Sequence, residues 1–136
     1  FGQARLCPPT VDQIAATAAM SAPPTYFENV RAEYVKRRDA VCESLAGIEG
    51  VVCQKPRGAF YTVAKLPVHD AEKFAIFLLD EFSMDGSTVM VAPAAGFYAT
   101  EGAGTNEVRI AYVLNVQDLK KAMQILAAGL EQFGRC

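Results

Sequence analysis

Apolar residues recur along this chain at a spacing of three to four residues in four places, and each place predicts a helix. The longest helix is expected to begin at the capping-box pattern Thr25–Glu28 and to end before Gly47, since glycine commonly terminates helices. A second capping box, formed by Thr10 and Gln13, predicts a short apolar helix near the N-terminus. Polar residues at two further helix starts complete the set, at Asp70 and Asn115.

Short runs rich in β-branched and aromatic residues predict four strands between these helices. The expected strands are 51–54, 59–63, 88–92 and 107–113. The resulting order, α-α-β-β-α-β-β-α, is typical of an α+β fold. We therefore predict a two-layer sandwich in which helices cover one face of a small mixed or antiparallel sheet.

The last predicted strand carries a single arginine, Arg109, among apolar residues. A two-residue period places Arg109 beside the small Ala111 on one face, which leaves room for another group to approach. The bulky face comprises Val108, Ile110 and Tyr112. A guanidinium on a half-buried strand needs an anionic partner, and a small-molecule carboxylate can accept two parallel hydrogen bonds from it. An ion pair with a neighbouring Asp or Glu explains the same arginine equally well.

Composition and charge argue against several classes of partner. The 136 residues suit one domain, and the net charge of −2 gives no electrostatic case for nucleic acid. The basic run 36–38 lies inside a helical pattern, so we interpret it as a solvated helix face or an interdomain contact. No apolar run approaches the roughly 18 residues that a membrane span needs, so no membrane partner is expected.

Catalytic and metal-binding residues are not evident in the sequence. The four cysteines form no CxxC pair and His69 is the only histidine, which leaves no zinc-binding pattern. Free thiols predict a reducing, cytoplasmic location, with a secreted disulfide pair as the alternative. His69 precedes Asp70 at a helix start, where a surface or capping role is expected. We predict no catalytic and no metal-ligating residue.

Two further segments carry residues suited to binding. Gly58 lies in a turn before a strand, where it could let a ligand or another backbone come close. Phe97 and Tyr98 lie in the Gly-rich segment 94–106, where they could form an apolar wall over a ligand. A hairpin turn and a loop pinned to the core explain the same residues. With Arg109, these residues look like half of a binding site.

Four motifs occur in a fixed order along the chain. They are Pro9-Thr10-x-x-Gln13-x-Ala15-Ala16, Pro56-x-Gly58-Ala59-Phe60-Tyr61, Val89-Met90-Val91-Ala92-Pro93 and Glu107-Val108-Arg109-Ile110-Ala111. Together they resemble the small C-terminal domain of fold-type-I pyridoxal-phosphate aminotransferases of class I and II, in the aspartate aminotransferase group. One departure is Tyr98, which follows Phe97 where many relatives have glycine.

The resemblance implies that Arg109 grips the α-carboxylate of the substrate, with Gly58 and Phe97 as further substrate-binding residues. It implies that residues 1–22 are the tail of a large domain and that residues 23–136 are the small domain. The parent would be a homodimeric transaminase that exchanges an amino group between an amino acid, with aspartate as the expected one, and a 2-oxo acid. Pyridoxal 5'-phosphate would be its cofactor, held by a lysine upstream of this chain. The isolated chain would then be inactive.

The start of the chain fits this view, because Phe1–Leu6 lacks an initiator Met and suggests a fragment of a longer protein. Without a large domain, the apolar helix near Val11 and Ile14 is expected to stay uncovered or to pair with another chain. Two alternatives remain open: a stand-alone amino-acid-binding regulatory domain, and the small domain of another fold-type-I enzyme or regulator.

Overall fold

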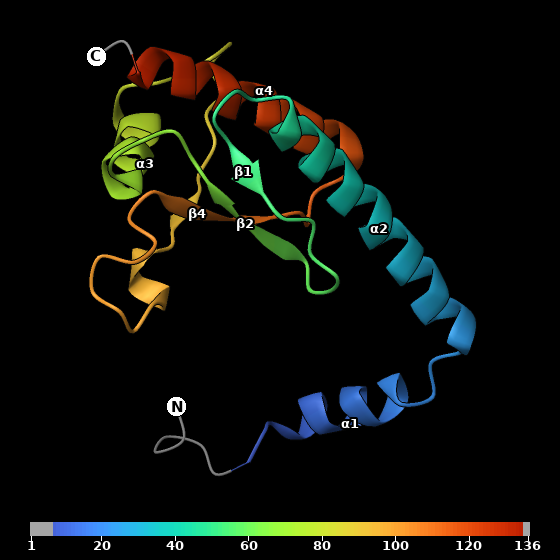
Figure 1. The fold of residues 1–136 in the computed structure, drawn as a ribbon. Coiled ribbons are helices and arrows are strands. Elements are labelled where there is room, and N and C mark those ends of the chain that lie inside the picture. The colour runs from blue at the N-terminus through green and yellow to red at the C-terminus, as the bar shows by residue number, and fades with distance from the viewer. Residues whose placement is uncertain (1–6, 135–136) are drawn as a thin grey trace. The chain divides into compact units, whose positions relative to one another are not determined.

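The computed structural model describes residues 7–134. Two expectations fall outside these residues: the fragment-like start at Phe1–Leu6 and the free thiol of Cys136. The elements in chain order are α1 (Thr10–Ala19), α2 (Pro24–Ala46), β1 (Val52–Cys53), β2 (Tyr61–Lys65), α3 (Ala71–Asp80), β3 (Ala92–Pro93), the 3-10 helix η1 (Ala95–Phe97), β4 (Glu107–Ala111) and α4 (Val116–Phe133) (Figure 1). Internal contacts divide the chain into two compact units, residues 1–32 and 33–136.

The described part of the first unit consists of α1 and the beginning of α2. Helix α1 starts at Thr10 as predicted, but the predicted capping box is wrong. Pro9 occupies the N-cap, and the Gln13 side-chain amide donates to the Pro8 carbonyl at 2.8 Å instead. The apolar side chains of α1 are exposed, with Val11 at 75% and Ile14 at 66%. This helix therefore presents an uncovered apolar surface.

The second unit contains one four-stranded sheet of order β1-β2-β4-β3 in which every neighbouring pair is antiparallel. Arg109 lies on the central strand β4, opposite Val63 of β2 and opposite Ala92 of β3. The sheet confirms the predicted α+β class and resolves its type as antiparallel. It also places Arg109 between two neighbouring strands.

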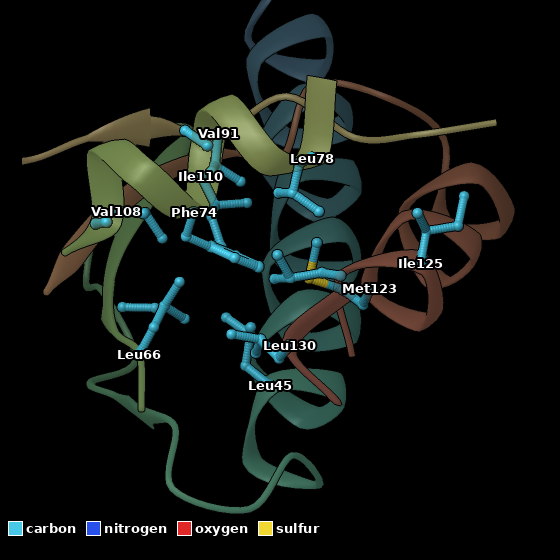
Figure 2. Close-up of a cluster of buried hydrophobic side chains, with 14 of the residues drawn as sticks. Leu45, Leu66, Phe74, Leu78, Val91, Val108, Ile110, Met123, Ile125 and Leu130 are labelled. Atoms are coloured by element: carbon cyan, nitrogen blue, oxygen red, sulfur yellow. The ribbon is translucent and has the colours of Figure 1, made fainter. Parts of the chain in front are cut away.

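The buried face of the sheet packs on helices (Figure 2). Val108 and Ile110 of β4 contact a core that includes side chains of α3 and α4. Other buried members are Val41 and Leu45 of α2, Ala64 of β2, Phe74 and Leu78 of α3, and Met123, Leu126 and Leu130 of α4. Helices thus cover one face of the sheet as predicted, and the other face stays open.

Two predicted helix starts are confirmed in atomic detail. The Asp70 carboxylate accepts from the backbone N–H groups of Glu72 and Lys73 before α3. The Asn115 side chain accepts from the Asp118 N–H before α4. Such caps satisfy N–H groups that the first helical turn leaves unpaired, typically for about 1 kcal/mol. None of the helices within residues 7–134 is long and apolar enough to cross a membrane.

The strands differ from prediction mainly at their ends. The predicted strand 88–92 pairs with β4 only at Ala92 and Pro93. The preceding segment is anchored to a helix instead, because the Thr88 hydroxyl donates to the Leu78 carbonyl at 2.5 Å. Strand β2 starts two residues later than expected, since Ala59 adopts a left-handed conformation with φ of 63°. That conformation interrupts an extended strand.

Candidate functional site

The open face of the sheet carries the residues that point away from the helices. Along β4, Val108 and Ile110 are buried while Arg109 and Ala111 are exposed. Along β2, Tyr61 and Val63 are on the exposed positions. Tyr112 is also fully buried, so the predicted division of the strand into a bulky buried face and an open Arg109 face is confirmed.

Two aromatic rings flank the Arg109 guanidinium. Its central carbon lies 4.9 Å from the centroid of the Phe97 ring and 5.5 Å from the centroid of the Tyr61 ring. Cation–π contacts of this kind are worth about 0.5–1 kcal/mol each at exposed positions. They keep the guanidinium close to both rings, and its N–H donors make no hydrogen bond within residues 7–134.

Arg109 has no acidic partner among residues 7–134. The ion pairs of this part of the chain involve Arg37, Arg38, Lys55 and Lys73. Glu107, two residues before Arg109 on the same strand, accepts a hydrogen bond from the Tyr98 hydroxyl. The alternative of a local ion pair is therefore not found in the described chain, and the guanidinium can bind an anion from outside it.

The two aromatic residues of the segment 94–106 make different contacts. Phe97 ends η1 and stands against Arg109. The Tyr98 ring covers Gly104, whose φ is +70° and where an added Cβ would overlap the ring. The hydrogen bond from the Tyr98 hydroxyl to Glu107 raises the pKa of Tyr98. Tyr98 thus pins the loop, and Phe97 is left to face the arginine.

Gly58 lies in the segment 56–59, referred to below as the 56–59 loop, in which Pro56 is half-buried and the other three residues are exposed. An added Cβ at Gly58 would meet nothing within 4 Å, so no neighbour in the described chain requires glycine there. The loop borders an open depression of about 500 Å³ that Tyr61 also lines. Because Tyr61 contacts Arg109 as well, this ring connects the depression to the arginine.

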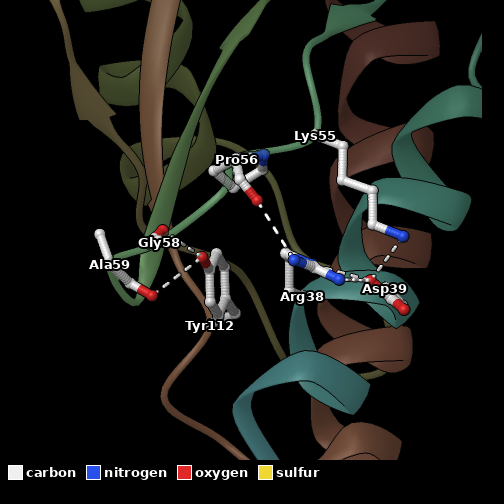
Figure 3. A network of polar contacts seen from close by, with 7 residues as sticks. All are labelled: Arg38, Asp39, Lys55, Pro56, Gly58, Ala59 and Tyr112. Carbon is white, nitrogen blue, oxygen red and sulfur yellow. Dashed lines mark hydrogen bonds and ion pairs between the residues drawn. The ribbon is translucent and has the colours of Figure 1, made fainter. Parts of the chain in front are cut away.

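Two residues that hold the 56–59 loop were not singled out from the sequence (Figure 3). The Tyr112 hydroxyl donates to the Gly58 and Ala59 carbonyls at 3.3 and 3.2 Å. The Arg38 guanidinium donates to the Pro56 carbonyl at 3.3 Å. From the sequence, Tyr112 was expected only as a core residue. Its contacts with Gly58 and Ala59 join residues more than fifty positions apart in the chain, and no local sequence pattern predicts such a contact.

The interpretation of the basic run 36–38 as a solvated helix face is wrong for two of its three residues. The side chains of Arg37 and Arg38 are only 20% and 21% exposed. Arg37 donates to the Val113 carbonyl at 2.7 Å, so both arginines bind backbone carbonyls within the second unit. Lys36 alone is exposed as expected.

The Arg38 side chain is itself held by an acidic neighbour. Asp39 accepts from Arg38 at 2.8 Å and pairs with Lys55 at 2.8 Å. The hydrogen bond from Arg38, followed by that from Lys55, lowers the pKa of the Asp39 carboxyl. The same pair with Asp39 raises the pKa of Arg38. Asp39 therefore stays ionised and keeps Arg38 directed at the loop.

The remaining candidates for chemistry fall outside this region. His69 is exposed beside the cap residue Asp70, as the sequence suggested. No group of three or more His, Cys, Asp or Glu side chains between residues 7 and 134 could hold a metal ion. The cluster of Arg109, Tyr61, Phe97 and the 56–59 loop is therefore the best-supported site in the described chain.

Comparisons with known proteins place this geometry in context. The family model of class I and II aminotransferases matches residues 2–126. The chain is 29% identical to an aspartate aminotransferase of Rhizobium meliloti, over 96% of the chain and 32% of that protein. It is 34% identical to an LL-diaminopimelate aminotransferase of Desulforudis audaxviator, over 85% of the chain and 28% of that protein.

A solved structure shares the fold. Alanine aminotransferase from Pyrococcus furiosus aligns with a TM-score of 0.77 at 26% identity, over 96% of the chain and 32% of that structure. The chain thus spans about a third of the length of the curated relatives it matches.

Proposed function

Since the chain belongs to the class I and II aminotransferase family, we propose that it is the substrate-binding small domain of a transaminase, with Arg109 as the ligand of the substrate α-carboxylate. Residues 23–136 would form this domain and residues 1–22 the tail of the large domain. One observation carries the proposal: Arg109 stands on the open face of the sheet between two rings, without an acidic partner in residues 7–134.

The geometry suits carboxylate recognition. A guanidinium that lies against aromatic rings can still direct two parallel N–H groups at the two oxygens of a carboxylate. Phe97 would form an apolar wall beside the bound amino acid, which strengthens the ion pair by excluding water. Gly58, with open space around its Cα, would let the ligand approach the loop backbone.

The family depends on pyridoxal 5'-phosphate, which acts as an electron sink during amino-group transfer. A lysine that anchors this cofactor has to face an enclosed site and lose its proton easily. All six lysines of this chain are exposed, and Lys55 and Lys73 are in ion pairs. The residues present do not fit an anchor, so we assign the anchoring lysine to a part of the parent outside this chain. We expect the isolated chain to be inactive.

The substrate and partners of the parent follow from its relatives. Aspartate is the proposed amino donor, because several of the similar proteins are aspartate aminotransferases. The α-carboxylate is common to all amino acids, so the role of Arg109 does not depend on that choice. A 2-oxo acid would be the acceptor, and the partners would be the protein's own large domain and a second subunit. We also propose a cytoplasmic location, which the free thiols of Cys7, Cys42 and Cys53 support.

The two alternatives from the sequence are less well supported. A stand-alone regulatory domain would need to bind amino acids unaided, whereas the relatives that the chain matches are aminotransferases about three times its length. A different fold-type-I enzyme would share the small domain but form different products.

The experiment that tests the proposal begins with the reading frame upstream of Phe1. We expect it to encode a large domain with a cofactor lysine, and the full-length protein to transaminate aspartate while the 136-residue chain does not. A stop codon or an unrelated domain upstream would contradict the proposal. Products other than a transaminated 2-oxo acid would favour the different enzyme.

A further inference from the structure

Three of the four carbonyl groups in the 56–59 loop accept hydrogen bonds from side chains elsewhere in the second unit (Figure 3). Arg38 of α2 binds the Pro56 carbonyl, and Tyr112 binds the carbonyls of Gly58 and Ala59. The loop is exposed from Arg57 to Ala59, and Ala59 has the left-handed φ of 63° that non-glycine residues rarely adopt. Its shape is therefore imposed by these two side chains as well as by its own sequence.

The Tyr112 and Arg38 side chains, which donate to the loop carbonyls, are themselves held in place by burial and by an ion pair. Tyr112 is fully buried, so its ring cannot follow the loop if the loop moves. Arg38 is directed by Asp39, which also pairs with Lys55 immediately before the loop. A buried hydroxyl without hydrogen-bond acceptors is destabilising, because it has lost its hydration. This cost favours the loop conformation in which the carbonyls of Gly58 and Ala59 face the Tyr112 hydroxyl.

The loop is connected to Arg109 by a short path. The Tyr112 N–H donates to the Phe60 carbonyl at 2.8 Å, and the next residue, Tyr61, begins β2. The Tyr61 ring stands 5.5 Å from the Arg109 guanidinium carbon. Tyr112 also lies three residues after Arg109, directly after the end of β4, so it binds the loop from the segment that follows the strand carrying the arginine. A change in the loop therefore moves one of the two rings that restrict Arg109.

We propose that Tyr112 and Arg38 are positioning residues for the Arg109 site: they hold the carbonyls of the 56–59 loop and thereby fix Tyr61 against the Arg109 guanidinium. This inference rests on the proposed function, because it treats Arg109 as the carboxylate ligand. Neither residue is expected to touch the substrate. Each acts on binding through the loop and Tyr61.

The test is steady-state kinetics of the full-length parent with Tyr112→Phe, which removes one hydroxyl and keeps the buried ring. We expect KM for the amino acid to rise roughly three- to tenfold, as the loss of a hydrogen bond predicts, with kcat within about twofold. Tyr34→Phe is the matched control, because the Tyr34 hydroxyl makes no hydrogen bond within residues 7–134. It should leave KM unchanged.

A double-mutant cycle with Arg109→Ala separates positioning from general stability. If Tyr112 acts through Arg109, adding Tyr112→Phe to Arg109→Ala should raise KM no further. Independent effects that multiply would overturn the proposal, as would an unchanged KM in Tyr112→Phe alone. If Arg109→Ala itself leaves KM unchanged, the proposed function fails instead, and the positioning role fails with it.

Arg38→Met provides a second variant on the other side of the loop. It should raise KM in the same way and show the same coupling to Arg109→Ala, whereas Lys36→Met, on the exposed residue of the same run, should not. Coupling for Tyr112 without coupling for Arg38 would overturn the part of the proposal that concerns Arg38.

Discussion

The guanidinium carbon of Arg109 lies 4.9 Å from the centroid of the Phe97 ring, although twelve positions separate the two residues in the chain. The loop that brings them together is held by Tyr98, which binds Glu107 on the same strand as Arg109. An exposed arginine would ordinarily sample many rotamers. Here the contact with the ring limits that freedom, which would reduce the entropy lost on binding of the proposed carboxylate ligand.

Replacing Phe97 tests the value of this contact. In the full-length parent, Phe97→Ala should raise KM for the amino acid about two- to fivefold, because one cation–π contact is lost. Phe97→Leu should behave similarly if the aromatic face matters and should recover most of the affinity if only apolar bulk matters. Met90→Ala, an 82% exposed apolar residue outside the site, is the control. An unchanged KM in Phe97→Ala would show that the ring does not contribute.

Tyr98 predicts a pH dependence of stability at alkaline pH. Its hydrogen bond to Glu107 raises its pKa above the ordinary value of 10.0 in the folded chain. The bond therefore contributes fully below pH 10 and is lost as pH rises through the higher folded pKa. Between pH 9 and about 11.5, the unfolding temperature of the 136-residue chain should fall more steeply than that of Tyr98→Phe. Parallel pH profiles of the two proteins would contradict this role of the hydroxyl.

Gly104 predicts a loss of stability when a side chain is added. Gly104→Ala should lower the free energy of unfolding by more than about 1 kcal/mol, since the position has φ of +70° and its Cβ would overlap the Tyr98 ring. Chemical denaturation of the isolated chain measures the change. A destabilisation below about 0.5 kcal/mol would mean that Tyr98 does not pack on this residue.

Gly58→Ala is the matched control for that measurement, because Gly58 has no positive φ and open space around it. The free energy of unfolding of Gly58→Ala should differ from that of the unsubstituted chain by less than about 0.5 kcal/mol. In the full-length parent the same substitution should raise KM, since the added methyl group would occupy space proposed for the ligand. An unchanged KM would remove Gly58 from the substrate-binding residues.

The exposed apolar side chains of α1 predict that the isolated chain associates. Val11 and Ile14 are 75% and 66% exposed, and such surfaces tend to pair with another chain. Sedimentation at increasing concentration should show dimers or larger species, and Val11→Ser with Ile14→Ser should restore the monomer. A chain that stays monomeric at high concentration would contradict this expectation.

Local patterns were sufficient to predict most of the fold. The caps at Asp70 and Asn115 form as expected, because capping depends on residues only two or three positions apart. The two faces of β4 also follow directly from alternation, which placed Arg109 on the open side. The predicted cap at Thr10 is wrong because Pro9 takes the N-cap position and Gln13 binds Pro8.

Long-range contacts could not be predicted in the same way. The hydrogen bond from Arg38 to Pro56 and those from Tyr112 to the 56–59 loop depend on how separate elements pack. The solvated-face interpretation of the basic run failed for this reason, since its charge pattern gives no sign of the carbonyl groups to which its two arginines donate. Likewise, the sequence does not predict that Phe97 and Tyr98 make different contacts, because this difference depends on the folded loop, in which Gly104 lies against the Tyr98 ring.

The most direct test of the account is the kinetics of Arg109→Ala and Arg109→Lys in the full-length parent. Loss of a bidentate, charge-assisted pair should lower kcat/KM for the amino acid about 10²-fold or more, and lysine should restore only part of it because the fork geometry is lost. Arg31→Ala, on an exposed arginine of α2, is the control. A change of less than about threefold in Arg109→Ala would contradict the assignment of Arg109 as the carboxylate ligand.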